Sequence, residues 1–77
     1  MSSDDSVVVN AKGLACPEPV MVAKSALGKS GGRPVEVSVD TATARDNVLR
    51  MAKREGRDAD ARADVDGFIV RIHAKKA

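Results

Sequence analysis

The segment Pro34 to Asp40 alternates strictly between apolar and polar side chains, and it constrains the fold more than any other feature of the chain. Val35, Val37 and Val39 would lie on one face of a β-strand, and the polar residues between them would lie on the other face. This pattern is typical of a strand that is buried on one face only. The valine face needs a second layer to cover it, so the alternation predicts a layered domain.

Two segments flanking this strand carry apolar residues at helical spacing. The first runs from about Pro17 to Lys29 and the second from about Ala44 to Glu55. The hydroxyls of residues 41–43 could cap the second segment, and Gly56 is a natural stop after it. We therefore expect one amphipathic helix in each segment.

Three further segments read as strands. Residues 6–10 hold a β-branched run, and residues 59–65 and 68–72 alternate on either side of Asp66-Gly67, which is a favoured two-residue hairpin turn. The expected order is β-α-β-α-β-β, and right-handed crossovers would place both helices on one face of a four-stranded mixed sheet. The fold class expected is an α/β (α+β) two-layer sandwich.

The composition fits one small domain over residues 1–77, with residues 1–5 expected to be disordered. No apolar run approaches the ~20 residues that span a bilayer, and the polar N-terminus lacks signal-peptide features. We therefore expect a cytoplasmic protein without membrane contact. The net charge of +2, from 13 basic and 11 acidic residues, is too small to indicate a nucleic-acid binder.

Cys16 is the only cysteine, and it precedes Pro17, Glu18, Pro19 and Val20 at the expected start of the first helix. With Cys16 as N-cap, the helix dipole would lower the pKa of the thiol, and the amides of Glu18 and Val20 would lie near the sulfur. Such a thiolate could hold a sulfane sulfur as a persulfide. The alternative is an inert, buried cysteine, because free cysteine also behaves as a small hydrophobe.

The segment Gly13 to Val20 resembles the Cys-Pro-x-Pro signature of the TusA/SirA/YedF family of small prokaryotic sulfur-carrier proteins. The resemblance extends over most of the chain, and residues 39–56 look closer to the YedF-like branch. It implies a fold like the C-terminal domain of translation initiation factor three. It also implies that Cys16 takes persulfide sulfur from a donor, such as a cysteine desulfurase or rhodanese-like protein, and passes it to an acceptor protein.

Four basic residues, Arg50, Lys53, Arg54 and Arg57, follow at i, i+3, i+4 and i+7 in the second expected helix. On one helix they would form a basic stripe that could dock an acidic partner. The alternative is an ordinary solvated helix face.

Two other function classes compete with a sulfur relay. One is a regulatory or RNA-binding module that uses the sheet and the basic second helix, and the other is a thiol redox sensor. Phe68 is the only aromatic residue, so stacking on RNA bases, and with it direct nucleic-acid binding, is not expected. His73 could act as a base toward Cys16, but an exposed strand histidine is the simpler interpretation. We expect no metal and no cofactor, because zinc-ligand spacing and nucleotide-binding glycine motifs are missing.

Overall fold

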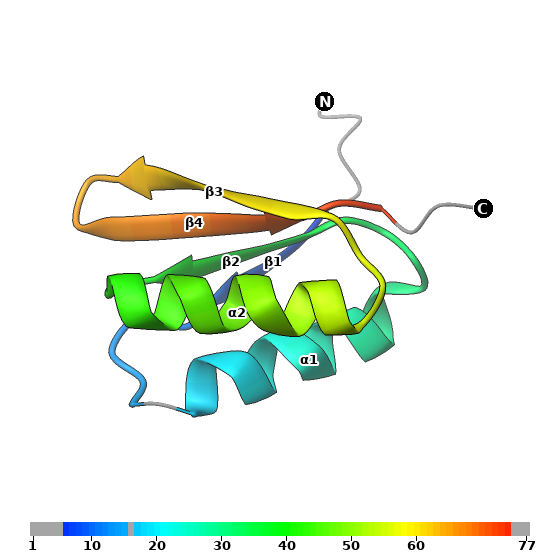
Figure 1. Cartoon of the computed structure of the whole chain (residues 1–77), viewed down its shortest axis with the longest axis horizontal. Coiled ribbons are helices and arrows are strands. Elements are labelled where there is room, and N and C mark those ends of the chain that lie inside the picture. Colours follow the sequence, from blue (N-terminus) through cyan, green and yellow to red (C-terminus); the bar gives the residue numbers. More distant parts are fainter. Residues whose placement is uncertain (1–5, 16, 75–77) are drawn as a thin grey trace.

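The computed structural model describes residues 6–15 and 17–74, and within them the predicted β-α-β-α-β-β order is confirmed. The elements are β1 (Val7–Asn10), α1 (Glu18–Ser30), β2 (Val35–Val39), α2 (Ala42–Arg54), β3 (Ala59–Asp64) and β4 (Gly67–Ile72). Both helices cover the same face of one sheet, as predicted (Figure 1). The predictions for residues 1–5 and for the placement of Cys16 fall outside the described residues.

The sheet is mixed, with strand order β1-β2-β4-β3. β1 pairs with β2 in parallel, and β4 pairs with β2 and β3 antiparallel. Val35 lies opposite Val7 on one side and opposite Ile72 on the other, so the start of β1 and the end of β4 share one end of the sheet. The carboxyl end of β2 lies at the opposite end.

The core is made of small aliphatic side chains beneath the two helices. Val35, Val37 and Val39 are fully buried, which confirms the predicted valine face of β2. Phe68 lies only partly buried at the margin of this core, where the Arg45 guanidinium stands 4.6 Å from the centre of its ring. Among the described residues, no helix is long and apolar enough to cross a membrane.

α2 begins at Ala42, two residues before the predicted start. The Thr41 hydroxyl is the reason, because its Oγ1 accepts the backbone N–H of Ala44 at 3.0 Å and so caps the helix. α2 ends at Arg54, and Gly56 then adopts a left-handed φ of 76° that turns the chain out of the helix.

The β3–β4 turn differs from the prediction. Asp64 pairs with Gly67, so the two-residue loop is Val65-Asp66 and not Asp66-Gly67. A Cβ atom at Gly67 would overlap with the carbonyl oxygen of Val39 on β2. Gly67 is therefore required by the close approach of two backbones, not by the conformation of the turn.

Arg57 does not continue a basic stripe, so this part of the prediction is wrong. It lies beyond the end of α2 and is only 9% exposed. Its Nε donates to the His73 carbonyl oxygen at 3.0 Å, and its Nη2 donates to the Arg33 carbonyl oxygen at 2.9 Å. The Arg57 guanidinium thus ties the end of β4 to the α1–β2 connection.

Replacing Gly67 by alanine should destabilise the fold by about 1–3 kcal/mol, because the added methyl group forces β4 away from β2. The matched control is Gly28→Ala in the interior of α1, where an added Cβ meets no atom within 4 Å. That change should stabilise the protein by about 0.5–1 kcal/mol through helix propensity. Urea unfolding of both variants measures the two free energies of unfolding. Equal changes in the two variants would contradict the prediction.

Arg57→Ala should cost on the order of 2–4 kcal/mol, because two charge-assisted hydrogen bonds are lost and two carbonyl groups lose their donor. Arg54→Ala removes an exposed arginine three residues earlier and should change the free energy of unfolding by less than about 0.5 kcal/mol. Thermal unfolding of the two variants measures the difference. Similar melting temperatures would show that Arg57 is not structural.

Candidate functional site

The loop of residues 11–15, which leads to Cys16, leaves the carboxyl end of β1. The carboxyl ends of the parallel strands β1 and β2 lie at the same end of the sheet. Crevices at the carboxyl ends of strands commonly hold the functional residues of α/β folds. The first turns of both helices and the β3–β4 hairpin lie at this same end (Figure 1). We call this region the loop end of the fold.

The start of the loop is fixed to the sheet. Ala11 is fully buried, and its N–H donates to the Ser38 carbonyl oxygen at 2.8 Å, one residue beyond the β1–β2 pairing. Gly13 then takes a left-handed φ of 82°, and its N–H donates to Oδ2 of Asp40 at 2.8 Å. Asp40 directly follows β2, so β2 holds the loop at two points.

Lys12 connects the loop to the β3–β4 hairpin. Its ammonium pairs with Asp66, and it reaches Oδ2 of Asp64 at 3.5 Å. The hydrogen bond to Asp66 raises the pKa of Lys12, and the same bond lowers the pKa of Asp66. These side chains are solvent-accessible, so the pairs contribute little to the free energy of unfolding.

α1 starts one residue later than predicted. Pro17, not Cys16, is the N-cap, and Glu18 is the first helical residue. The Glu18 N–H donates to the Ala15 carbonyl oxygen at 2.8 Å, so this amide is not free to face the sulfur as expected. Pro19 is buried at the second helical position, where the missing N–H costs no helical hydrogen bond, and Val20 packs partly buried against the core.

The chain is exposed on both sides of Cys16. Ala15 and Pro17 are its direct neighbours, and both are exposed, as is Leu14. Buried Ala11 and buried Pro19 bracket this exposed stretch. Cys16 itself lies outside the described residues, so its predicted role rests on its place in the sequence, directly before Pro17, the N-cap of α1.

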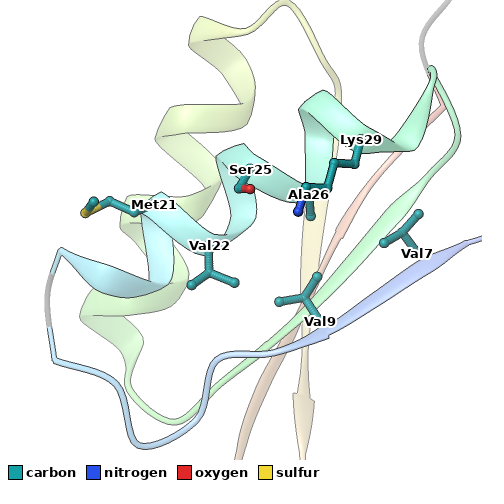
Figure 2. Close-up of a pocket in the computed structure, with 7 residues that line it drawn as sticks. All are labelled: Val7, Val9, Met21, Val22, Ser25, Ala26 and Lys29. Atoms are coloured by element: carbon teal, nitrogen blue, oxygen red, sulfur yellow. The ribbon is translucent and has the colours of Figure 1, made fainter.

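A mostly apolar groove of about 440 Å³ runs between α1 and the edge strand β1. Figure 2 shows Val7 and Val9 of β1 on one side and Met21 and Val22 of α1 on the other, with Lys29 at the far end. Met21 is 62% exposed and lies one turn after Pro17. The groove thus begins beside the loop end, but among the described residues its lining holds no pair of groups suited to acid–base chemistry.

The structure does not bring the remaining basic residues to the loop. Arg50, Lys53 and Arg54 are exposed, but they occupy the C-terminal half of α2. Arg50 lies eight positions after Ala42, which corresponds to about 12 Å along the helix axis. Arg50 also donates to Oδ1 of Asn47 at 3.2 Å.

His73 lies at the opposite end of the sheet from the loop, because it follows the end of β4. Its Nε2 is 2.7 Å from Oδ2 of Asp60, with which it forms a pair on the face without helices. It therefore does not lie beside the loop that carries Cys16. Within residues 6–15 and 17–74, no cluster of three or more histidine, cysteine, aspartate or glutamate residues could hold a metal ion.

Sequence reasoning missed Asp40 and Lys12 as parts of this site. Asp40 could have been found, because a residue that directly follows the second strand of a β-α-β unit lies beside the loop after the first. Lys12 gave no such signal, since its partners Asp64 and Asp66 are more than 50 residues away in the sequence.

Comparison with known proteins agrees with this architecture. The TusA sulfurtransferase family matches residues 7–76. The crystal structure of a SirA-like protein from Desulfitobacterium hafniense is similar to this chain, with a TM-score of 0.82 and 34% sequence identity over 91% of this chain and 99% of that one. No curated protein matches the sequence. The chain belongs to the TusA family of sulfurtransferases.

Proposed function

We propose that this protein is a sulfur carrier in which Cys16 accepts a sulfane sulfur from a donor protein and relays it to an acceptor protein. The observation that carries the proposal is the exposure of Ala15 and Pro17 between the buried anchors Ala11 and Pro19. A cysteine in such a stretch can be reached by the active site of another protein. Membership of the sulfurtransferase family supports the same role.

The transfer needs no oxidant or reductant. The Cys16 thiolate attacks the outer sulfur of a donor persulfide, a new S–S bond forms, and the donor cysteine leaves as a thiolate. The outer sulfur keeps its proton, and Cys16 becomes the persulfide. The reverse chemistry delivers the sulfur to an acceptor thiolate, and the N-terminus of α1 favours the anionic forms of Cys16.

The partners in this proposal are a persulfide donor, such as a cysteine desulfurase or rhodanese-like protein, and a downstream acceptor protein in the cytoplasm. The pattern of residues 39–56 supports the YedF-like branch of the family. Arg50, Lys53 and Arg54 lie away from the loop. Their role in this proposal is therefore long-range attraction of an acidic partner, not contact with the loop. Arg57 is excluded from this surface by its burial.

Incubation with a cysteine desulfurase and cysteine should add the mass of one sulfur atom to the wild-type protein, and a reducing thiol should remove it. Cys16→Ser should gain nothing, since it lacks the only thiol. Intact-protein mass spectrometry measures both. A wild-type thiol that reacts with iodoacetamide but takes sulfur from neither a desulfurase nor a rhodanese-like donor would contradict the carrier role and favour a redox sensor.

Lys53→Glu should slow persulfide loading by about two- to fivefold at low ionic strength, because it reverses a charge that steers the donor. The difference should shrink as salt screens the charges. The matched control is Arg62→Glu, which reverses an exposed charge on β3, on the sheet face without helices. Equal slowing by both variants would show that only net charge matters and that α2 is not the docking surface.

A further inference from the structure

Asp40 holds the loop from a rigid position. It stands between Val39, which is fully buried and paired with Phe68, and Thr41, which caps α2. The backbone on both sides of Asp40 is therefore fixed by other contacts. Its short side chain spans the gap to Gly13, which is 27 residues away in the sequence, in a 2.8 Å hydrogen bond.

The turn at Gly13 decides the direction in which the loop continues. Ala11, one residue after β1, is still hydrogen-bonded to β2, and Leu14 is already exposed. A left-handed φ of 82° lies between them, and a Cβ atom added at Gly13 would meet no atom within 4 Å. The direction of the chain from Gly13 toward Ala15 therefore depends on hydrogen bonds.

Beyond Ala11, whose N–H is bonded to the Ser38 carbonyl oxygen, the bond from Gly13 to Asp40 links the loop to the rest of the fold through a shorter side chain than the Lys12 bridge does. It joins a backbone N–H to a carboxylate, which is a charge-assisted hydrogen bond on a side chain with few rotatable bonds. The ion pair between Lys12 and the exposed Asp66 depends on the long and flexible side chain of Lys12. The Leu14 N–H to Ala11 carbonyl contact is long, at 3.4 Å.

We infer that Asp40 is a positioning residue for sulfur transfer, an inference that rests on the proposed carrier function. Its carboxylate fixes the Gly13 turn and so aims the stretch that carries Cys16 at the active site of the partner. Asp40 takes no part in the chemistry itself. The effect is geometric, and misplacing a reacting group by about 1 Å can cost up to about a hundredfold in rate.

The test compares Asp40→Ala with Asp40→Asn. The alanine variant cannot accept the Gly13 N–H, whereas the asparagine side chain keeps an acceptor oxygen and loses only the charge. Asp40→Ala should lower kcat/KM for loading by a desulfurase about tenfold, and Asp40→Asn should stay within about threefold of wild type. Asp46→Ala is the matched control, because it removes an exposed carboxylate that pairs with Arg45 and not with the loop.

Two further readouts separate positioning from a general loss of structure. Hydrogen exchange of the Gly13 amide, followed by NMR, should be at least about tenfold faster in Asp40→Ala than in wild type, because the exchange reports this bond directly. Iodoacetamide, a small reagent, needs no particular orientation of the loop. Its rate with the Cys16 thiolate, taken from a pH profile, should therefore stay within about threefold in every variant.

If Asp40→Ala loads as fast as wild type while its Gly13 amide exchanges faster, the positioning role is overturned and the carrier function stands. If wild type itself is not loaded, the proposed function fails first. Should Asp40→Ala not fold, Gly13→Val provides the test, because a β-branched residue disfavours the left-handed turn while its Cβ atom would meet no other atom within 4 Å. Normal loading of that folded variant would also overturn the inference.

Discussion

Burial of the valine face of β2 is the constraint on which the rest of the structure depends. β2 lies inside the sheet, with β1 on one side and β4 on the other, and both helices lie over the same face. The loop before Cys16 depends on β2 as well. The Ser38 carbonyl oxygen and the Asp40 carboxylate are the two groups that hold Ala11 and Gly13. The strand that organises the core thus also sets the geometry of the loop.

The sequence predicted an element correctly wherever its hydrophobic periodicity matches the burial of its side chains in the structure. The alternation of residues 34–40 predicted β2, and helical spacing predicted both helices to within a few residues. Predictions failed where a distant contact decided the outcome. Gly67 is required by the backbone of Val39, and Arg57 leaves the helical pattern because the chain turns at Gly56 and its guanidinium finds carbonyl partners. Neither the approach of Gly67 to Val39 nor the hydrogen bonds of Arg57 can be recognised from a repeating pattern in the sequence.

The same distinction holds for the candidate site. Cys16 is a prediction from a short local motif, in which a single reactive residue type stands beside two prolines. The groups that hold its loop come from β2 and from the β3–β4 hairpin, and they become visible only when the topology brings these elements together. The two prolines also differ in a way that the motif does not show. Pro17 is exposed at the N-cap, whereas Pro19 is buried and anchors α1.

The alignment of Val7, Val35 and Ile72 at one end of the sheet has a practical consequence. The chain enters β1 and leaves β4 at the end opposite to the loop before Cys16 (Figure 1). A fluorescent protein, an affinity tag or a solid support attached before β1 or after β4 would therefore be joined to the fold at the end opposite to this loop. The end that carries the loop before Cys16 would stay accessible to other proteins, so the fold is suited to tethering and to fusion with other domains.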